Sequence, residues 1–303
     1  MSYKKYRYLG SSIFTLVLGG CSNLELLSPK GTIGEHEKSL ILLSMGIMLC
    51  VVIPVVGLSM FFAWRYRASN RNATYAPTWA HSTGVEVVVW SIPIVVISFL
   101  GWTIWRTTHE LDPYKPLVAG RPAVEVDVVA LNWKWLFIYP EYGVATVNTL
   151  SIPVDRPINF HLTSDSMMNS FFIPQLGSQV YAMAGMETQL HLMGTVPGTY
   201  MGRSTAFSGP GFSGMQFPTH VLTDDQFAAW LQTAHASSAT LDGDAYLGLR
   251  KDSEDNPEAL YGHVAPHLFG DITTQYDCRM QNSLRRVGDV TRCDVHAAVM
   301  ENQ

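Results

Sequence analysis

Charged residues and cysteines are both scarce in this 303-residue chain. Lys, Arg, Asp and Glu together make up 15% of the residues, and the formal net charge is -5. So low a charged fraction suits a protein that lies partly in lipid. No basic stripe with interleaved aromatic residues is present, so nucleic acid is not an expected partner. The sequence also lacks a phosphate-binding loop, a nucleophile triad and paired carboxylates at catalytic spacing, and it therefore offers no complete catalytic site of its own.

The four cysteines lie at positions 21, 50, 278 and 293, and they form neither a Cys-x-x-Cys pair nor a zinc-binding spacing. Cys50 lies inside an apolar run, where a cysteine acts as a small hydrophobic residue. Cys278 and Cys293 lie in the C-terminal tail. If that tail faces an oxidising compartment, the two can form a disulfide. Two unpaired thiols are the other interpretation, and both stay open.

The N-terminus has the layout of a secretory signal. Lys4, Lys5 and Arg7 form a positive region, and a short apolar stretch follows. That stretch is too short for a stable span, so residues 1–20 are predicted to be a cleaved signal peptide. Its end, Leu-Gly-Gly-Cys, resembles a bacterial lipoprotein box, which implies cleavage before Cys21 and a lipid on its sulfur. An ordinary signal peptide with a chance cysteine is the alternative.

Two later runs are long enough to cross a bilayer. Residues 39–64 and 84–105 are almost free of charge, and each reaches the ~20 residues that cross ~30 Å of hydrocarbon. Pro54 and Pro93 lie inside them, which spanning helices tolerate. Residues 21–112 are therefore predicted to form a membrane anchor with two transmembrane helices.

The connector between the two runs carries Arg65, Arg67 and Arg71 and no acidic residue before Glu86. Excess arginine marks the cytoplasmic side of a membrane protein. The first run is therefore predicted to enter the cytoplasm and the second to leave it, so that everything after Trp105 lies outside. Lipidation of a cysteine near the N-terminus takes place on the outer face and requires the same orientation.

Residues 113–223 are predicted to form an all-β domain. Residues 124–137 alternate in the way that is typical of half-buried strands, and this alternation places Trp133 and Trp135 on one face of a strand. His161 and His191 are expected to be exposed or locally hydrogen-bonded rather than metal ligands. Further strand-like runs, separated by turns rich in proline and glycine, indicate a β-sandwich or barrel; they lie at residues 158–162, 179–183 and 188–192.

The last part of the chain is predicted to be mixed. Residues 224 to about 234 have helical spacing of apolar residues and two acids that complement the helix dipole. Residues 237–257 are polar and are predicted to be a loop, whereas residues 261–269 are rich in aromatics. The region 224–277 is therefore expected to be helical and aromatic-rich. No motif follows, and 278–303 is predicted to be a disordered tail.

The most specific pattern lies in residues 200–215. Their frame resembles the copper loop of cytochrome c oxidase subunit II, which reads Gly-x-Cys-x-Glu-x-Cys-Gly-x-x-His-x-x-Met and is completed by a further His upstream. Here the glycines fall on Gly202 and Gly209, and the methionine falls on Met215. The other positions are occupied by Ser204 and Ser208 in place of the cysteines, Ala206 in place of the glutamate, Phe212 in place of the loop histidine and Asn169 in place of the upstream histidine.

The replaced ligands decide what the resemblance implies. In the copper-bearing proteins two Cys, two His and the Met hold a dinuclear copper centre, and copper needs such thiolate and imidazole ligands. Hydroxyls, an amide and a phenyl ring cannot take their place, so no metal is expected here. The pattern is similar to subunit II of the cytochrome bo-type ubiquinol oxidases, and the resemblance runs from about Cys21 to the mid-260s.

This resemblance implies two N-terminal transmembrane helices, an all-β cupredoxin-like Greek-key sandwich and a short α-helical C-terminal extension. It implies a role in an oxidase of the bacterial inner membrane that couples ubiquinol oxidation and oxygen reduction to proton translocation. The haems, the active-site copper and the quinol site are then expected in subunit I and other membrane subunits, with no cofactor bound by this chain. The aromatic patch around Trp133 and Trp135 lies toward subunit I in that family, which is the alternative to a purely structural role.

Glu86, at the start of the second apolar run, has two interpretations. An acid at the edge of a span can simply lie among lipid headgroups. Haem-copper oxidases, however, carry a glutamate in this motif at the cytoplasmic mouth of a proton channel, and ionisable groups near spans often mark proton routes. The resemblance therefore implies that Glu86 collects protons for subunit I.

Two other functions fit the same frame less well. A cytochrome c oxidase subunit II requires copper ligands, which five positions of this chain lack. A membrane-anchored cupredoxin-like lipoprotein that acts in copper handling or oxidase assembly is the second alternative. Two full spans are superfluous for a protein that a lipid already anchors, which counts against it.

Overall fold

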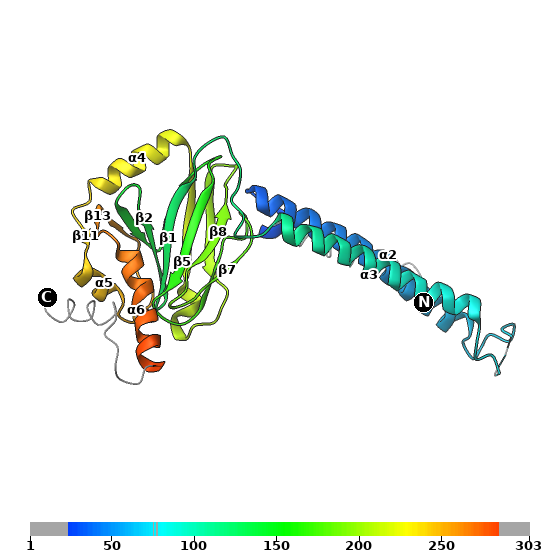
Figure 1. Ribbon diagram of the computed structural model, residues 1–303. Coiled ribbons are helices and arrows are strands. Elements are labelled where there is room, and N and C mark those ends of the chain that lie inside the picture. Colours follow the sequence, from blue (N-terminus) through cyan, green and yellow to red (C-terminus); the bar gives the residue numbers. More distant parts are fainter. Residues whose placement is uncertain (1–23, 75, 77, 285–303) are drawn as a thin grey trace, which may run out of the picture. The chain divides into compact units, whose positions relative to one another are not determined.

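A computed structural model describes residues 24–74, 76 and 78–284, with side chains up to residue 276. The chain divides into two compact units, one formed by His36–Asp112 and the other by the residues before and after that segment (Figure 1). The predicted signal peptide, Cys21, Cys293 and the end of the predicted tail lie outside the described residues.

Two long helices make up the first unit. Helix α2 (Thr32–Arg65) and helix α3 (Thr83–Glu110) have mean hydropathies of 2.7 and 2.2 in their most apolar windows, which is apolar enough to cross a membrane. Both helices contain the predicted apolar runs and continue beyond them at either end. Most of the extra residues are polar. The helices continue through them because backbone hydrogen bonds, and not hydropathy, decide where a helix ends.

The second unit is a β-sandwich, as predicted. Its larger sheet has the strand order β12-β3-β2-β1-β5-β8, and its smaller sheet has the order β4-β10-β9-β6-β7. A third, two-stranded sheet pairs β11 with β13. The strands are β1 (Val124–Leu131), β2 (Lys134–Tyr139), β3 (Val144–Val147), β4 (Leu150–Pro153), β5 (Ile158–Ser164), β6 (Asn169–Phe172), β7 (Val180–Ala182), β8 (Thr188–Leu192), β9 (Gly198–Ser204), β10 (Gln216–Leu222), β11 (Thr240–Leu241), β12 (Ala259–Tyr261) and β13 (His263–Val264).

The two large sheets enclose an aromatic core. The rings of Phe171 and Phe217 stack at 5.4 Å between centroids, and Trp135 packs edge-on against both at 5.5 and 5.8 Å. Val124, Val126 and Val128 face this core from β1 and are fully buried. Burying aromatic rings of this size dominates the energetics of such a core.

The predicted continuous strand through Trp133 is wrong. β1 and β2 form an antiparallel hairpin in which Leu131 pairs with Lys134, so Asn132 and Trp133 form the turn. Trp133 has a φ of 59°, a left-handed conformation that a bulky residue rarely adopts. Trp135 lies in the core as predicted, whereas Trp133 contacts residues 208–211.

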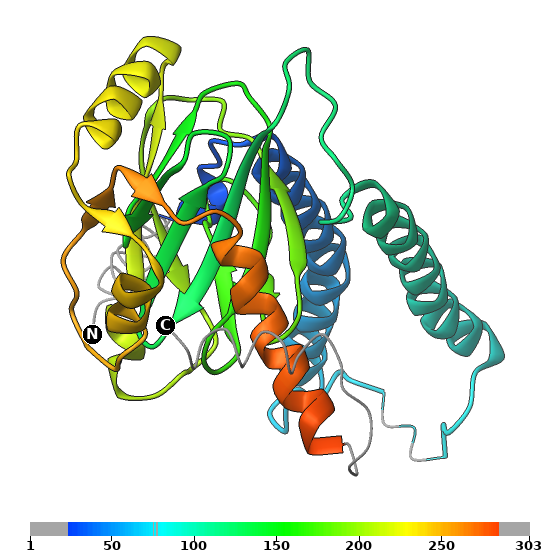
Figure 2. The same cartoon turned by 60° about the vertical axis from the view of Figure 1, so that its left-hand side comes forward.

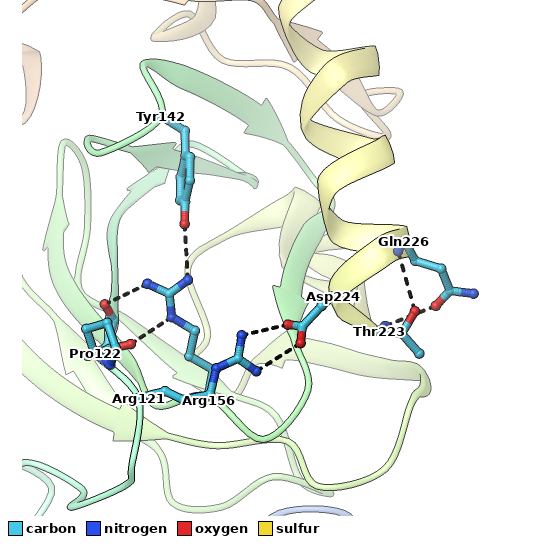
Figure 3. Close-up of polar contacts among 8 residues, drawn as sticks. Arg121, Pro122, Tyr142, Arg156, Thr223, Asp224 and Gln226 are labelled. Atoms are coloured by element: carbon cyan, nitrogen blue, oxygen red, sulfur yellow. Dashed lines mark hydrogen bonds and ion pairs between the residues drawn. The ribbon is translucent and has the colours of Figure 1, made fainter.

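Helix α4 (Asp224–His235) confirms the predicted helix and begins with a capping box. The backbone N–H of Gln226 donates to the Thr223 hydroxyl, and the Gln226 side chain accepts from the Thr223 N–H (Figure 3). Arg121 donates two hydrogen bonds to Asp224, at 2.9 and 3.1 Å. This pair ties the linker that precedes β1 to the start of the helix.

The rest of the C-terminal region covers the outer face of the larger sheet. Helix α5 (Gly243–Leu249) and helix α6 (Leu268–Leu284) bury a second core against β1, β2 and β3 (Figures 1 and 2). The predicted loop at 237–257 is therefore wrong for 240–249: Asp242 caps α5 by accepting from Ala245 N–H at 2.9 Å, and β11 precedes it. The predicted disorder of 278–303 is also wrong for 278–284, which are helical. Because β12 pairs with β3, the region after residue 223 contributes a strand to the sandwich itself.

The segment before α2 also belongs to the sandwich unit. The N–H of Lys30 donates to the Gln175 carbonyl at 2.6 Å, and the N–H of Thr195 donates to the Lys30 carbonyl at 2.8 Å. Gly31 and Gly194 form an antiparallel bridge between these bonds. The N-terminal segment is thus held by backbone pairing before the first long helix leaves the unit.

Candidate functional site

Most of the positions that the resemblance matches to copper ligands lie close together in the structure. The side chains that occupy the replaced positions are poor ligands for copper. Asn169 begins β6, Ser204 ends β9, and Met215 directly precedes β10. The Ser204 hydroxyl lies 3.2 Å from the Asn169 amide oxygen and 3.3 Å from the Ala206 carbonyl. The backbone N–H of Ser204 donates to the Met215 carbonyl at 3.0 Å. Asn169, Ser204, Ala206 and Met215 therefore lie close together in the structure.

Ser208 and Phe212 complete the former copper loop, which we define as residues 204–215. The Ser208 hydroxyl donates a long hydrogen bond of 3.5 Å to the Met215 sulfur, and both side chains are buried. Phe212 turns to Phe207, with ring centroids 5.6 Å apart, and Phe207 is 79% exposed. Phe212, at the position of the loop histidine, thus forms a small aromatic pair with Phe207.

Trp133 packs against the loop and donates a hydrogen bond to it. Its indole N–H donates to the Ser208 carbonyl at 2.9 Å. A side chain at Gly211 would collide with the indole ring, and Gly209 approaches the same ring with a φ of 110°. The unusual turn conformation of Trp133 therefore has a packing reason, because it carries the ring under the loop.

The donor set does not fit a dinuclear copper centre. Copper of this type needs thiolate and imidazole ligands, and the loop offers two neutral hydroxyls, an amide and one thioether. The hydroxyls of Ser204 and Ser208 are engaged with Asn169, Ala206 and Met215. Hydrogen bonds of about 1 kcal/mol each hold these positions together.

The second predicted site residue, Glu86, lies in the first turn of α3 and has a partner that the sequence interpretation missed. Its carboxylate is 2.6 Å from Nδ1 of His81, and the two side chains are 49% and 68% exposed. His81 Nε2 lies 3.3 Å from the Thr83 hydroxyl. A carboxylate accepts, so Nδ1 carries the proton of this contact. Two titratable groups therefore sit in hydrogen-bond contact at the start of a long apolar helix.

A further polar cluster joins the C-terminal region to the hairpin that carries Trp133. The Lys134 ammonium is buried and donates to the Lys251 carbonyl at 2.8 Å and to the Ser253 hydroxyl. Burial lowers the pKa of Lys134, and the charge of nearby Asp252 opposes that shift. We call residues 250–256 the 250–256 segment. It packs against the start of β2, next to the turn that carries Trp133.

Asp165 anchors the same segment at a second point. Its fully buried carboxylate accepts from Arg250 Nε at 2.8 Å and from the Tyr246 hydroxyl at 2.5 Å. Burial, followed by the negative charge of Asp165, raises the pKa of Tyr246 well above its usual range. The Tyr246 hydroxyl therefore keeps its proton and donates a hydrogen bond to the Asp165 carboxylate.

Two known families match parts of this chain. Residues 141–221 match the family described as "Cytochrome C oxidase subunit II, periplasmic domain", and residues 235–277 match the family described as "COX Aromatic Rich Motif". The first match contains the whole loop and Asn169, and the second covers α5, β12, β13 and the first part of α6.

Curated relatives resemble the chain over most of its length. The cytochrome bo(3) ubiquinol oxidase subunit 2 of Pseudomonas putida is 50% identical over 91% of this chain and 89% of its own length. The ubiquinol oxidase subunit 2 of Acetobacter aceti is 51% identical over 89% of this chain and 88% of its own length. The quinol oxidase subunit 2 of Bacillus spizizenii is 38% identical over 76% of this chain and 72% of its own length.

Proposed function

Because the chain belongs to the ubiquinol oxidase subunit II family, whose members are membrane-anchored subunits of multi-subunit haem-copper oxidases with a periplasmic domain, we propose that it serves a terminal oxidase that oxidises ubiquinol, reduces oxygen to water and translocates protons. The observation that carries this proposal is the former copper loop, where hydroxyl and amide groups bond to one another in place of a metal.

The identity of the electron donor follows from that loop. Cytochrome c is water-soluble and gives up one electron at a time, so an oxidase that uses it needs a metal relay outside the membrane. Ubiquinol dissolves in the bilayer and can reach a haem within the membrane directly. A subunit II that lacks the cysteine and histidine ligands is compatible with the second donor and not with the first.

The cofactors of the reaction are assigned to other chains. We infer that the haems and the active-site copper lie in subunit I, that smaller membrane subunits complete the complex, and that this chain binds none of these groups. Its own contribution is to support subunit I and to supply a proton-collecting group. We infer that the protein lies in the bacterial inner membrane with the sandwich in the periplasm, and the two apolar helices and the arginines of their connector support this assignment.

Glu86 is the proposed proton-collecting group, and His81 is its partner. A carboxylate attracts protons by its charge and releases them by titrating, and an imidazole 2.6 Å away can exchange the proton with it. Both groups are about half exposed or more, which gives water access to the pair. The pair thus has the properties of a surface group that feeds a proton route.

The test of the donor assignment is purification of the chain from its own membranes. A haem-bearing larger subunit should copurify, and the complex should oxidise a short-chain ubiquinol but not reduced cytochrome c. A purple dinuclear copper spectrum from the chain, or turnover with cytochrome c, would overturn the proposal.

The test of Glu86 is turnover of the assembled complex at matched haem content. Glu86→Gln keeps the shape but removes titration, so assembly should survive while quinol oxidation falls by about a hundredfold, the low end of what a proton-transfer group contributes. Glu86→Asp should retain part of the rate. Glu110→Gln makes the same change at the other end of α3, where Glu110 pairs with Arg106, and should leave turnover unchanged. An unchanged rate in Glu86→Gln at every pH would leave Glu86 as an interfacial residue only.

We also propose that residues 1–20 are a signal peptide and that Cys21 carries the lipid. Labelling with a radioactive fatty acid such as palmitate should be lost in Cys21→Ser. The variant should stay in the membrane fraction, because two helices still anchor it. Release of the variant as a soluble protein would contradict the assignment of α2 and α3 as spans.

A further inference from the structure

The outer face of the larger sheet has an apolar half and a charged half. The C-terminal region covers the apolar half through the second core. The charged half carries Glu125 and Asp127 from β1, His161 from β5 and Glu187 from the turn before β8. Asp127 lies at the border, because its register partners are Ile138 in the covered half and His161 in the charged half.

Three of these four charged groups satisfy one another. His161 Nδ1 lies 2.7 Å from a Glu187 oxygen, and His161 Nε2 lies 2.9 Å from a Glu125 oxygen. Ionised carboxylates only accept hydrogen bonds, so both ring nitrogens donate and the imidazole is positively charged. Glu125 also accepts from the Asn159 amide at 2.7 Å. His161 therefore has no lone pair left for a metal ion.

The carboxylate of Asp127 is different, because no hydrogen bond among the described residues reaches it. Burial raises the pKa of Asp127 to about 6; the charge of His161 opposes this shift, and the charges of Glu187 and Glu125 add to it. A partly buried carboxylate without a hydrogen-bond donor gains from a cationic partner.

Asp127 faces a cavity of about 330 Å³ between the sandwich and the C-terminal region. The sandwich side contributes Ile138 and Tyr139, and the other side contributes Pro266, Leu268 and Phe269. Among the lining residues that the structure describes, Asp127 is the only carboxylate. The volume lies at the low end for small-ligand sites and is enough for one long side chain.

We propose that this cavity binds the ammonium or guanidinium group of a lysine or arginine side chain from a neighbouring polypeptide of the oxidase complex. Lys and Arg bury an apolar stem and present a charged head, which matches apolar walls with a single acid at their edge. The three carboxylates of the charged half face one cation, His161, so the local charge favours a positive group and disfavours an anion. The proposal depends on the chain being part of a complex and not on the role of Glu86.

The first experiment measures binding to the isolated full-length chain in a neutral detergent. The probe is n-butylguanidinium chloride, and its neutral counterpart is 1-pentanol. Heteronuclear NMR should show shifts at the cavity residues with the cation only, at pH 8. At pH 5 the apparent affinity should fall by about tenfold, because most of an acid with a pKa near 6 is then protonated. The other titratable groups near Asp127 are His161, Glu125, Glu187 and the lining residue His267, and protons added to any of them act in the same direction.

Asp127→Asn tests the carboxylate directly, because it keeps the shape and removes the charge. Binding of the probe should be lost, whereas Asp225→Asn, at an exposed position of α4, should bind as wild type does. Absence of binding to the wild-type chain, or equal binding to Asp127→Asn, would overturn the proposal.

The second experiment asks whether a polypeptide fills the cavity. Asp127→Cys is treated with a trimethylammonium methanethiosulfonate reagent, and peptide mass spectrometry measures the label at position 127. The isolated chain should react, and the assembled complex should be protected by at least about tenfold. Equal labelling in the two samples would show that the cavity stays open in the complex, and a free amine or a lipid headgroup would then replace the proposed partner.

Discussion

The former copper loop and the 250–256 segment both fix parts of the sandwich without a metal, but they use different chemistry. In the loop, neutral hydroxyl and amide groups bond to neighbours within one hairpin and one adjacent strand. In the 250–256 segment and its flanks, two fully or almost fully buried charges, on Lys134 and Asp165, reach groups more than eighty positions away in the sequence.

The difference lies in what happens when one partner is removed. A neutral hydrogen bond contributes about 1 kcal/mol, and water can partly replace it. A buried charge that loses its partner costs about 3–5 kcal/mol, because it was already taken out of water. The loop should therefore tolerate substitution, whereas the attachment of the C-terminal region should not.

The largest effect is expected from Asp165→Asn. The change removes the charge that pairs with Arg250 and accepts from Tyr246, and it should destabilise the protein by about 3 kcal/mol, the lower end for a broken buried pair because Arg250 is partly exposed. The midpoint of urea unfolding, followed by tryptophan fluorescence in detergent, measures it. Glu254→Gln, in the same segment but exposed, is the matched control, and equal midpoints for the two variants would remove the contrast between loop and segment.

Lys134→Met should have a smaller effect that is local. It keeps the apolar stem but removes the donor to Lys251 and Ser253, and it also removes the cost of burying an ammonium group. Hydrogen exchange of residues 250–256 should therefore become about fivefold faster, which corresponds to ~1 kcal/mol, with little change in the unfolding midpoint. A large loss of global stability without faster local exchange would contradict this assignment.

The charged half of the outer sheet face should make stability depend on pH. Burial lowers the pKa of His161, but its hydrogen bonds to Glu187 and Glu125 and the charges of Glu187 and Asp127 outweigh burial and raise that pKa. The pKa of Asp127 is also raised, so at both groups the native state binds protons more tightly than the unfolded chain. Stability is then greatest below about pH 4 for the Asp127 contribution and below 6.5 for that of His161, and it falls as pH rises through the native pKa values. The expected loss between pH 5 and pH 8 is on the order of 1 kcal/mol, since solvent weakens these partly exposed contacts.

Comparison of wild type with the double variant Asp127→Asn, His161→Gln checks this dependence. Urea unfolding midpoints at several pH values should lie on a flatter curve in the variant. The same slope in both proteins would assign the pH dependence to other groups.

The smallest effects are expected in the former copper loop. Ser204→Ala removes a hydroxyl with two neighbours at 3.2 and 3.3 Å and should cost about 1 kcal/mol. Ser208→Ala removes only a 3.5 Å contact with sulfur and should cost roughly half of that or less. Unfolding midpoints of the two variants in parallel decide the order, and a cost for Ser208→Ala above that for Ser204→Ala would show that the sulfur contact had been undervalued.

Periodic features of the sequence were good predictors of the fold. The long apolar runs became α2 and α3, and alternating residues became strands, because both patterns report burial along a single element. The turn at Trp133 was missed because apolar alternation continues through it, and a tryptophan is not a residue that signals a left-handed turn. The capping box at Thr223 and Gln226, in contrast, could have been read from their spacing.

The candidate sites were predictable only in part. The spacing of the ligand positions from Asn169 to Met215 was enough to place them together, because a family frame fixes that geometry. His81 was missed because a polar residue five positions before Glu86 looks like any connector residue. The Asp165–Arg250 pair was missed because nothing in either local sequence indicates a partner so distant in the chain.

The backbone pairing of Gly31 with Gly194 gives the two long helices a second tether. The sandwich unit is connected to residues 36–112 at two points of the chain, before His36 and after Asp112. A protease cut in the 113–122 linker would leave the segment before α2 bound to the sandwich through these backbone contacts. The two fragments would separate only when those hydrogen bonds break.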